Sequence, residues 1–382
     1  MANDTLTEAK KNKNDEFYTQ YSDIQKEISA YLDFNPKVFK NKTILLPCDD
    51  PEWSNFTKFF AQNFKRFGLK KLISTSFAVE SKNYKHNYQP TLFERSNKKY
   101  DSKKTKFKGK IFTLSKDITG DGIINIDDLD WDYLKGDGDF RSEEVIKLRD
   151  ESDIVITNPP FSLLREFILW INESKKDFIL IANNSAVGTK DIFSLLKDNK
   201  IWFGNGFNAG NAYFSLPQNP ERDYATGVYD DDTGLVKFRN ACWLTNLEHG
   251  RRHQPLELMT MKDNLKYNKR LKGKNAYEKY QNYDAIEVPF TNAIPKDYKK
   301  VMGVPISFFE KYCPDQFEIL GMCENLDLYK LKTKRYSSSD CKDAYFKKFN
   351  KKGIYDLNAS GVLLKDGLLE KVYQRVLIRR KK

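Results

Sequence analysis

Short apolar segments alternate with amphipathic segments between residues 43 and 204, and this alternation limits the folds open to the chain. The apolar segments are flanked by polar residues, which is typical of buried strands. The amphipathic segments have apolar residues at helical spacing, and the one that begins at Ser142 has Glu143 and Glu144 in its first turn. This order predicts an α/β fold with a largely parallel, doubly wound sheet. The strand-like segments are TILLP (43–47), LKKLISTSFA (69–78), KIFTLS (110–115), DIVIT (153–157), DFILIANN (177–184) and KIWFG (200–204).

A phenylalanine-rich helix is predicted after the first of these strands, in SNFTKFFAQNFKRFG (54–68). Gly68 follows the last aromatic residue and is a typical helix stop. Five phenylalanines recur along one face, which we expect to be buried: Phe56, Phe59, Phe60, Phe64 and Phe67.

The alternation ends near residue 215, and short apolar runs then lie among long polar stretches. We therefore predict a first domain over residues 15–215 and a second, α+β domain over 216–382. Residues 1–14 are polar and lysine-rich and form a basic arm. The last segment, KVYQRVLIRRKK (371–382), is predicted to be helical.

The net charge of +12 and the pI near 9.1 indicate a polyanionic partner. The N-terminal residues lack the apolar segment of a signal peptide, and no apolar stretch approaches the ~18 residues that span a membrane. The five cysteines are scattered and show no C-x-x-C spacing, so we expect neither a disulfide framework nor a zinc site. These features predict a cytoplasmic protein.

A rigid turn follows the strand DIVIT, because Asn158-Pro159-Pro160-Phe161 places two prolines where the strand must end. Ligands bind at the carboxyl ends of strands in open α/β sheets. The Asn158 amide oxygen and the Pro159 carbonyl could accept both hydrogens of one planar amino group, while Phe161 offers a flat surface beside it. Such an arrangement suits an amine that attacks an electrophile in line. The alternative is a structural Pro-Pro turn.

The segment DIVITNPPF resembles the N-P-P-[FY] motif of S-adenosylmethionine-dependent methyltransferases that act on adenine N6, cytosine N4 or protein glutamine. With the other segments below, the chain is similar to the EcoRI-type adenine-N6 DNA methyltransferases. The resemblance implies a Rossmann-like methyltransferase domain and a C-terminal DNA-recognition domain. The segments are DEFYTQYSDI (15–24), LLPCDDPEWSNFTKFF (45–60), GDGDFRSEE (136–144), KIWFG (200–204), CWLTNL (242–247) and GVPISFFEKYCPDQFEILG (303–321).

The resemblance implies roles for individual residues. Asn158, Pro159, Pro160 and Phe161 would hold the target adenine, with Asn158 also bordering the cofactor. The cofactor-binding residues would be Phe17, Tyr18 and Thr19 in the N-terminal motif, Pro47, Cys48, Asp49 and Asp50 in the turn after the first strand, and Asp139 with Phe140 at the cofactor's adenine.

Two features depart from the wider methyltransferase pattern. CDDPEW (48–53) replaces the usual glycine-rich turn, and the second strand lacks the acidic residue that binds the ribose. Asp49 or Asp50 could bind the ribose instead. The alternative for this pair is an Asx turn that caps the phenylalanine-rich helix.

The DNA-binding residues are predicted only as basic clusters. A target adenine inside a duplex must be flipped out, and phosphate contacts would compensate for that cost. For each charge taken alone, a solvated surface is the simpler interpretation, and the prediction rests on the clusters as a set. The candidates are Lys10, Lys11 and Lys13, the lysines of residues 81–110, Arg251 and Arg252, and Arg379 and Arg380.

The segment DITGDGIINIDD (117–128) is close to the spacing of a calcium-binding loop, with Gly122 at the sharp turn. A bound Ca²⁺ would be structural. The alternative is an Asp/Gly turn that caps a helix over residues 126–134. The metal ligands would be Asp117, Thr119, Asp121, Ile123, Asn125 and Asp128.

The hypothesis drawn from these features is a site-specific DNA methyltransferase that transfers a methyl group from S-adenosylmethionine to N6 of a flipped-out adenine. It would be the modification enzyme of a restriction-modification system or a solitary methylase. Two alternatives stay open, a protein-glutamine methyltransferase and a catalytically silent DNA-binding protein of the same fold. We expect a bacterial or phage monomer that binds double-stranded DNA and no membrane, with any cognate restriction endonuclease acting separately.

Overall fold

The computed structural model describes residues 18–51, 54–78, 98–207, 212–216, 227–271 and 273–381. The chain divides into two compact units. The first comprises residues 1–192 and 201–250, and the second comprises residues 193–200 and 251–382. Among the described helices, none is long and apolar enough to cross a membrane.

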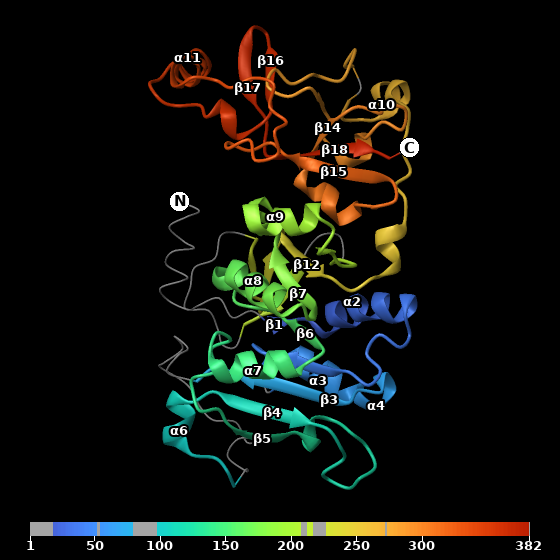
Figure 1. Cartoon of the computed structure of the whole chain (residues 1–382), viewed down its shortest axis with the longest axis vertical. Helices are drawn as coiled ribbons and strands as arrows, with labels where there is room; N and C mark the ends of the chain where they lie inside the picture. Colours follow the sequence, from blue (N-terminus) through green and yellow to red (C-terminus); the bar gives the residue numbers. More distant parts are fainter. Residues whose placement is uncertain are drawn as a thin grey trace. The chain divides into compact units, whose positions relative to one another are not determined.

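An eight-stranded sheet forms the centre of the first unit (Figure 1). The four central strands are parallel, whereas each neighbour outside them pairs antiparallel. The strand order is β5 (Asp130–Tyr133), β4 (Lys110–Leu114), β3 (Lys71–Ser76), β2 (Thr43–Leu46), β6 (Ile154–Thr157), β7 (Asp177–Asn183), β12 (Ala241–Thr245) and β8 (Trp202–Phe203).

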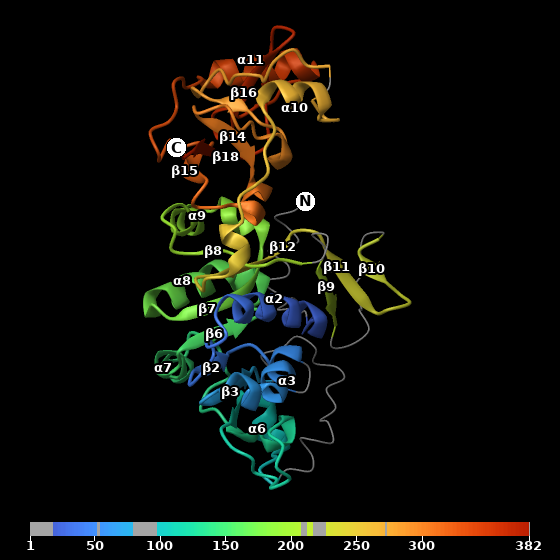
Figure 2. The ribbon, with the colours of Figure 1, turned by 90° about the vertical axis from the view of Figure 1, so that its right-hand side faces the viewer.

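Helices cover both faces of this sheet (Figure 2). Helices α2 (Tyr21–Phe34) and α3 (Asn55–Gln62) lie on one side, and α7 (Glu143–Glu151) and α8 (Leu164–Ser174) lie on the other. The predicted α/β layering is therefore present, but the sheet is mixed, so the prediction of a largely parallel sheet was wrong for its outer strands. Apolar runs indicate burial and do not encode strand direction.

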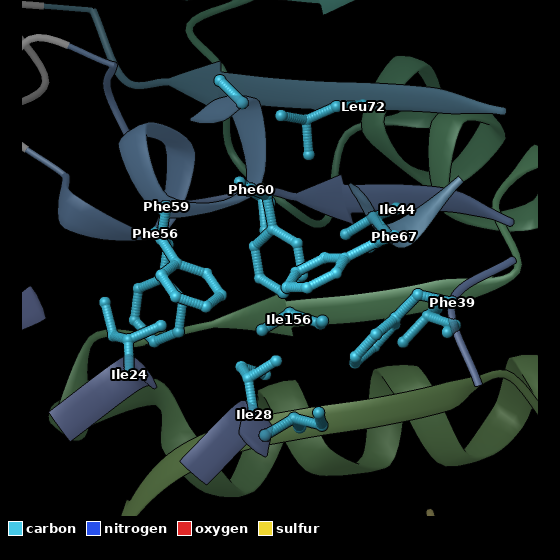
Figure 3. Close-up of a cluster of buried hydrophobic side chains, with 14 of the residues drawn as sticks. Ile24, Ile28, Phe39, Ile44, Phe56, Phe59, Phe60, Phe67, Leu72 and Ile156 are labelled. Carbon is cyan, nitrogen blue, oxygen red and sulfur yellow. The ribbon is translucent and has the colours of Figure 1, made fainter. Parts of the chain in front are cut away.

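The predicted phenylalanine-rich helix is confirmed as α3 followed by the short α4 (Phe64–Phe67). Ser54 caps α3 by accepting a hydrogen bond from the main-chain N–H of Phe56, and Gly68 ends α4 with a positive φ of 64°. The aromatic face packs into a cluster with apolar residues of α2 and the central strands (Figure 3). Its labelled members are Ile24, Ile28, Phe39, Ile44, Phe56, Phe59, Phe60, Phe67, Leu72 and Ile156.

A second, four-stranded sheet in this unit has the order β1 (Tyr18–Thr19), β9 (Ala212–Ser215), β11 (Leu235–Phe238) and β10 (Tyr229–Asp230). Strand β12 then returns to the main sheet beside β7. The described residues between 227 and 250 therefore belong to the first unit, which corrects the domain boundary predicted at residue 215. The change in sequence pattern there marks a change to antiparallel strands, not the start of another compact unit.

The second unit is built on a four-stranded sheet with a separate hairpin. The segment 371–382, predicted to be helical, instead contains a strand that lies between two antiparallel neighbours, where Val376, Leu377 and Ile378 are all buried. The sheet order is β13 (Ile286–Glu287), β14 (Met302–Pro305), β18 (Arg375–Arg380) and β15 (Phe317–Met322); the hairpin is β16 (Val362–Lys365) and β17 (Leu368–Lys371). The longer helices are α10 (Met261–Tyr267) and α11 (Ser338–Phe349).

Candidate active site

The Asn-Pro-Pro-Phe segment forms a turn at the carboxyl end of β6, as predicted. Pro159 is buried, while Asn158, Pro160 and Phe161 are half-buried. The carbonyl of Pro160 accepts from the N–H of Leu163 at 2.9 Å, which starts the turn that leads into α8. The two prolines thus end the strand and keep the Asn158–Phe161 segment at the edge of the sheet.

The turn after β2 lies at this same edge, because β2 and β6 are parallel neighbours. Asp49 connects the two turns. Its carboxyl group accepts from the Ser54 hydroxyl at 2.6 Å and from the Thr157 hydroxyl at 2.5 Å. Thr157 immediately precedes Asn158, so a single buried side chain fixes the predicted cofactor turn to the predicted catalytic turn.

Asp49 is 3% exposed, and this burial raises the pKa of its carboxyl from 3.8 to about 7. Removal from water disfavours the charged form, and the nearby charge of Asp50 acts in the same direction. The hydrogen bonds from Ser54 and Thr157 lower the pKa and offset part of the effect. The carboxyl therefore titrates near neutral pH.

Asp49 is buried, and both of its carboxyl oxygens accept hydrogen bonds inside the protein, so the structure does not support this residue as the ribose ligand. Asp50 is half-buried and stays the proposed ribose ligand. The alternative prediction, that Asp49 or Asp50 caps the phenylalanine-rich helix in an Asx turn, was wrong about the capping residue, because the side chain that caps α3 is Ser54. Pro47 is buried and accepts from the Thr75 hydroxyl at 2.9 Å, whereas Cys48 is half-buried.

The loop that carries Asp139 approaches the carboxyl end of β3. The N–H of Ala78 donates to the carbonyl of Asp137 at 2.8 Å. Gly138 has a φ of +90°, and a Cβ there would overlap the Ser76 carbonyl. Since β2 and β3 are parallel neighbours, Asp139 lies at the same edge of the sheet as the turn of Asp49 and Asp50.

Asp139 itself is held by Arg141. Its carboxylate accepts from the Nε of Arg141 at 2.9 Å and from Nη2 at 2.6 Å, and Arg141 also pairs with Glu166 at 3.2 Å. The hydrogen bonds from Arg141 to Asp139 raise the pKa of the guanidinium. Arg141 therefore fixes the orientation of the carboxylate predicted to contact the cofactor's adenine.

The side chain of Phe140 is buried in the core beside α8. Its ring is fully buried, with centroids 4.9 Å from Phe167 and 5.5 Å from Trp170 on α8. The ring therefore anchors the Asp139 loop in the core, and the contact of Phe140 with the cofactor's adenine stays a prediction.

Tyr18 and Thr19 form β1, which pairs with β9. The side-chain amide of Asn55, at the start of α3, donates to the carbonyl of Thr19 at 2.7 Å. This bond fixes the predicted N-terminal motif beside the helix that follows the Asp49 turn. Phe17 lies outside the described residues.

Phe161 has aromatic partners that the sequence did not reveal. Its ring centroid lies 6.2 Å from that of Phe214 on β9 and 5.7 Å from that of Phe238 on β11, both edge-to-face. Phe214 is fully buried, and both rings pack against Phe161 and hold it in place. Neither residue belongs to a recognisable motif, and only the pairing of β9 with β11 brings them together.

The basic residues predicted to bind DNA lie in different environments. Arg252 is only 5% exposed and donates to the side chain of Asn199, so it is not available to read bases. Arg251 is half-buried. Arg379 is exposed and pairs with Glu318 at 2.7 Å, and Arg380 is half-buried. Lys10, Lys11, Lys13 and the lysines of residues 79–97 lie outside the described residues.

The calcium-like loop closes through its own main chain. Asp117 accepts from the N–H groups of Gly120 and Gly122, and Asp128 accepts from those of Ile118 and Thr119. In the described part of the chain, no group of three or more His, Cys, Asp or Glu side chains could hold a metal ion. The predicted Ca²⁺ is therefore not supported. The alternative prediction, an Asp/Gly turn that caps a helix over residues 126–134, is half correct. The turn is present, but a single 3₁₀ turn (Ile126–Asp128) and strand β5 replace the predicted helix.

Comparisons of the sequence with a family model and with individual proteins agree on one family. Residues 5–381 match the family described as adenine-specific methyltransferase EcoRI. Type II methyltransferase M.EcoRI of Escherichia coli is 39% identical over 327 residues, which cover 85% of this chain and 91% of that protein. Type II methyltransferase M.MpnI of Mycoplasma pneumoniae is 34% identical over 336 residues, 87% of this chain and 90% of the relative. No solved structure matches.

Proposed function

Because the chain belongs to the family of EcoRI-type adenine-specific methyltransferases, we propose that it methylates N6 of an adenine within a specific sequence of double-stranded DNA. Its relatives are type II methyltransferases, which supports a DNA methyltransferase of the restriction-modification type. The observation that carries the proposal is the turn of Asn158, Pro159 and Phe161, which Asp49 joins to the turn after β2.

The residues at this edge of the sheet fit S-adenosylmethionine. Asp50 and Asp139 supply carboxylates suited to the ribose hydroxyls and the adenine amino group. Asp50 follows β2, and the loop of Asp139 approaches the carboxyl end of β3, the parallel neighbour of β2. Ligands bind at the carboxyl ends of the strands in such a Rossmann-like arrangement. When bound, the cofactor supplies an electrophilic methyl group on a sulfonium.

The turn at Asn158 orients the amine that attacks this methyl group. The Asn158 side-chain oxygen and the Pro159 carbonyl each accept one hydrogen of the adenine amino group, which directs the nitrogen lone pair away from the base. With S-adenosylmethionine bound, this nitrogen would take the methyl group as the bond between methyl and sulfur breaks, and it would then release one proton. No strong general base is required before the attack, since the amine attacks in its neutral form.

The target adenine must leave the duplex to reach this turn, at a cost of a few kcal/mol. The half-buried ring of Phe161, supported by Phe214 and Phe238, provides the surface on which the flipped base stacks. We further propose that the second unit recognises the target DNA. A cytoplasmic location, a monomeric state and a separate endonuclease stay predictions.

The proposal is tested with purified protein, unmodified plasmid DNA and labelled S-adenosylmethionine, followed by nucleoside mass spectrometry. N6-methyladenine is expected with the native protein. Asn158→Ala should lower the rate by roughly 100-fold or more, the usual cost of one lost oriented polar group.

Asn172→Ala is the matched control, since Asn172 is an exposed residue of α8 and should leave the rate unchanged. If the protein binds the cofactor but produces no methylated base, the DNA-enzyme proposal is overturned. A test for methylation of a glutamine substrate would then separate the two alternatives. Methylation would indicate a protein-glutamine methyltransferase, and its absence would indicate a catalytically silent DNA-binding protein.

A further inference from the structure

One end of the four-stranded sheet in the second unit carries a hollow of about 960 Å³. The parallel strands β13 and β14 end there, and the antiparallel β18 begins there, with Pro305 opposite Arg375. The segments after β13 and β14 and the segment before β18 line it, together with Arg270. Binding pockets commonly have volumes of about 300–1,000 Å³. The catalytic mechanism gives this hollow no role.

A buried ion pair fixes one wall of the hollow. The Arg375 guanidinium donates to the Glu287 carboxylate from Nη2 at 2.7 Å and from Nε at 3.1 Å, and Tyr280 donates its hydroxyl to the same carboxylate. The Nη1 of Arg375 donates to the carbonyls of Tyr373 and Gln374 at 3.3 and 3.4 Å. The turn that carries Tyr373 and Gln374 is thus held in place before any ligand binds. Such preorganisation lowers the entropy lost on binding.

Cationic and aromatic groups on the hollow are available to a ligand. Tyr373 is 89% exposed, the largest exposed fraction among the large apolar and aromatic side chains described. The guanidinium of Arg270 lies 4.1 Å from the centroid of the Phe290 ring, which holds its plane. Within the described residues, no carboxylate forms an ion pair with Arg270 or Lys311. Their charges therefore suit a polyanion, in agreement with the net charge of +12.

The side chains on the hollow match base edges better than phosphate alone. Arg and Lys donate to guanine, Asn and Gln pair with adenine, Glu accepts from cytosine, and apolar groups contact the thymine methyl. Glu310 would repel a phosphate, so a site for phosphate alone does not explain it. The hydrogen-bonding side chains on the hollow include Arg270, Asn292, Ser307, Glu310, Lys311 and Gln374.

We propose that this hollow reads base edges in the major groove of double-stranded DNA and so helps to choose the methylated sequence. This inference rests on the proposed function. The major groove is the relevant surface because only there do all four base pairs present different donor and acceptor patterns.

The test is a binding selection with the full-length protein and S-adenosylhomocysteine. Duplexes bound from a pool of random sequences are recovered and sequenced. The native protein should select one sequence. Arg270→Ala and Gln374→Ala should each lose preference at one or two positions of that sequence. Each should also bind the selected duplex roughly 5- to 150-fold more weakly, the usual range for one base contact.

Arg335→Ala is the matched control, because this exposed arginine of the same unit donates to the carbonyl of Leu326 and does not line the hollow. It should select the same sequence as the native protein. Unchanged selection by the Arg270 and Gln374 variants would overturn the inference. Equal weakening on every sequence would also overturn it, since that pattern indicates phosphate contacts. Methylation of the selected duplex is measured in parallel, and its absence in the native protein would count against the proposed function instead.

Discussion

Asp49 is the residue on which the geometry of the candidate site depends most directly. It is buried between the helix cap Ser54 and Thr157, the last residue of β6. Removing its side chain would leave two buried hydroxyl groups without an acceptor, at a cost of about 1–3 kcal/mol each. Asparagine, in contrast, could accept from Ser54 and donate to the Thr157 oxygen, as the protonated carboxyl would.

The first residue-scale prediction concerns pH. Burial raises the pKa of Asp49 from 3.8 to about 7, so between these values the folded protein keeps a proton that the unfolded chain releases. The contribution of this group to stability is therefore fully present below about pH 4 and is lost as the pH rises to 7, by at most about 4 kcal/mol. Asp49→Asn should flatten this dependence in urea unfolding at about pH 5 and about pH 7.5.

Comparison of the native protein with the Asn variant isolates this group from other carboxyls that titrate in the same range. Equal changes in unfolding free energy for the two proteins would refute the assignment. Asp49→Ala completes the series and should be less stable than the Asn variant at both pH values.

At the scale of elements, helix α2 is joined to the loop after β8 by one carboxylate. Glu27 is fully buried and accepts from the N–H of Asn205 at 2.9 Å and from that of Gly206 at 3.0 Å, as well as from the Tyr31 hydroxyl at 2.7 Å. Phe207 follows in this loop, and its ring centroid lies 6.3 Å from that of Phe214, which packs against Phe161. The position of the loop therefore bears on the wall of the candidate active site.

The prediction at this scale concerns the close approach at Gly204. A Cβ there would overlap the Glu27 carboxylate and lie 2.8 Å from the Cβ of Trp243. Gly204→Ala should therefore destabilise the protein by about 1–3 kcal/mol in urea unfolding. Gly136→Ala is the control, because no atom lies within 4 Å of a Cβ there, and its effect should be within about 0.5 kcal/mol. Similar losses for both variants would refute the close packing.

At the scale of the whole molecule, the net charge of +12 governs association with DNA. Phosphate contacts release counterions, so affinity falls steeply as salt rises. If about six to ten phosphates are neutralised, affinity for a duplex should fall by about 10³- to 10⁵-fold between about 50 and 200 mM salt. Titration of a fluorescent duplex measures this slope, with S-adenosylhomocysteine binding as the control. A slope near zero would contradict phosphate-driven binding.

Several features of this protein follow from local sequence pattern without any knowledge of long-range contacts. Alternating apolar runs located the main strands, the phenylalanine spacing located the buried face of α3, and the two prolines located the turn after β6. These features are local because strand and helix periodicity report which faces are buried, and proline restricts its own backbone. The family is also readable at this level, because the motif around Asn158 is a contiguous run of residues.

Which distant groups meet depends instead on tertiary packing. Asp49 bonds Thr157 across 108 positions, Phe161 meets Phe214 and Phe238, and β12 returns to the main sheet beyond the predicted domain boundary. The burial of Phe140 has the same origin. Strand direction and long-range hydrogen bonds depend on how whole elements pack, and a run of apolar residues satisfies several such packings equally well.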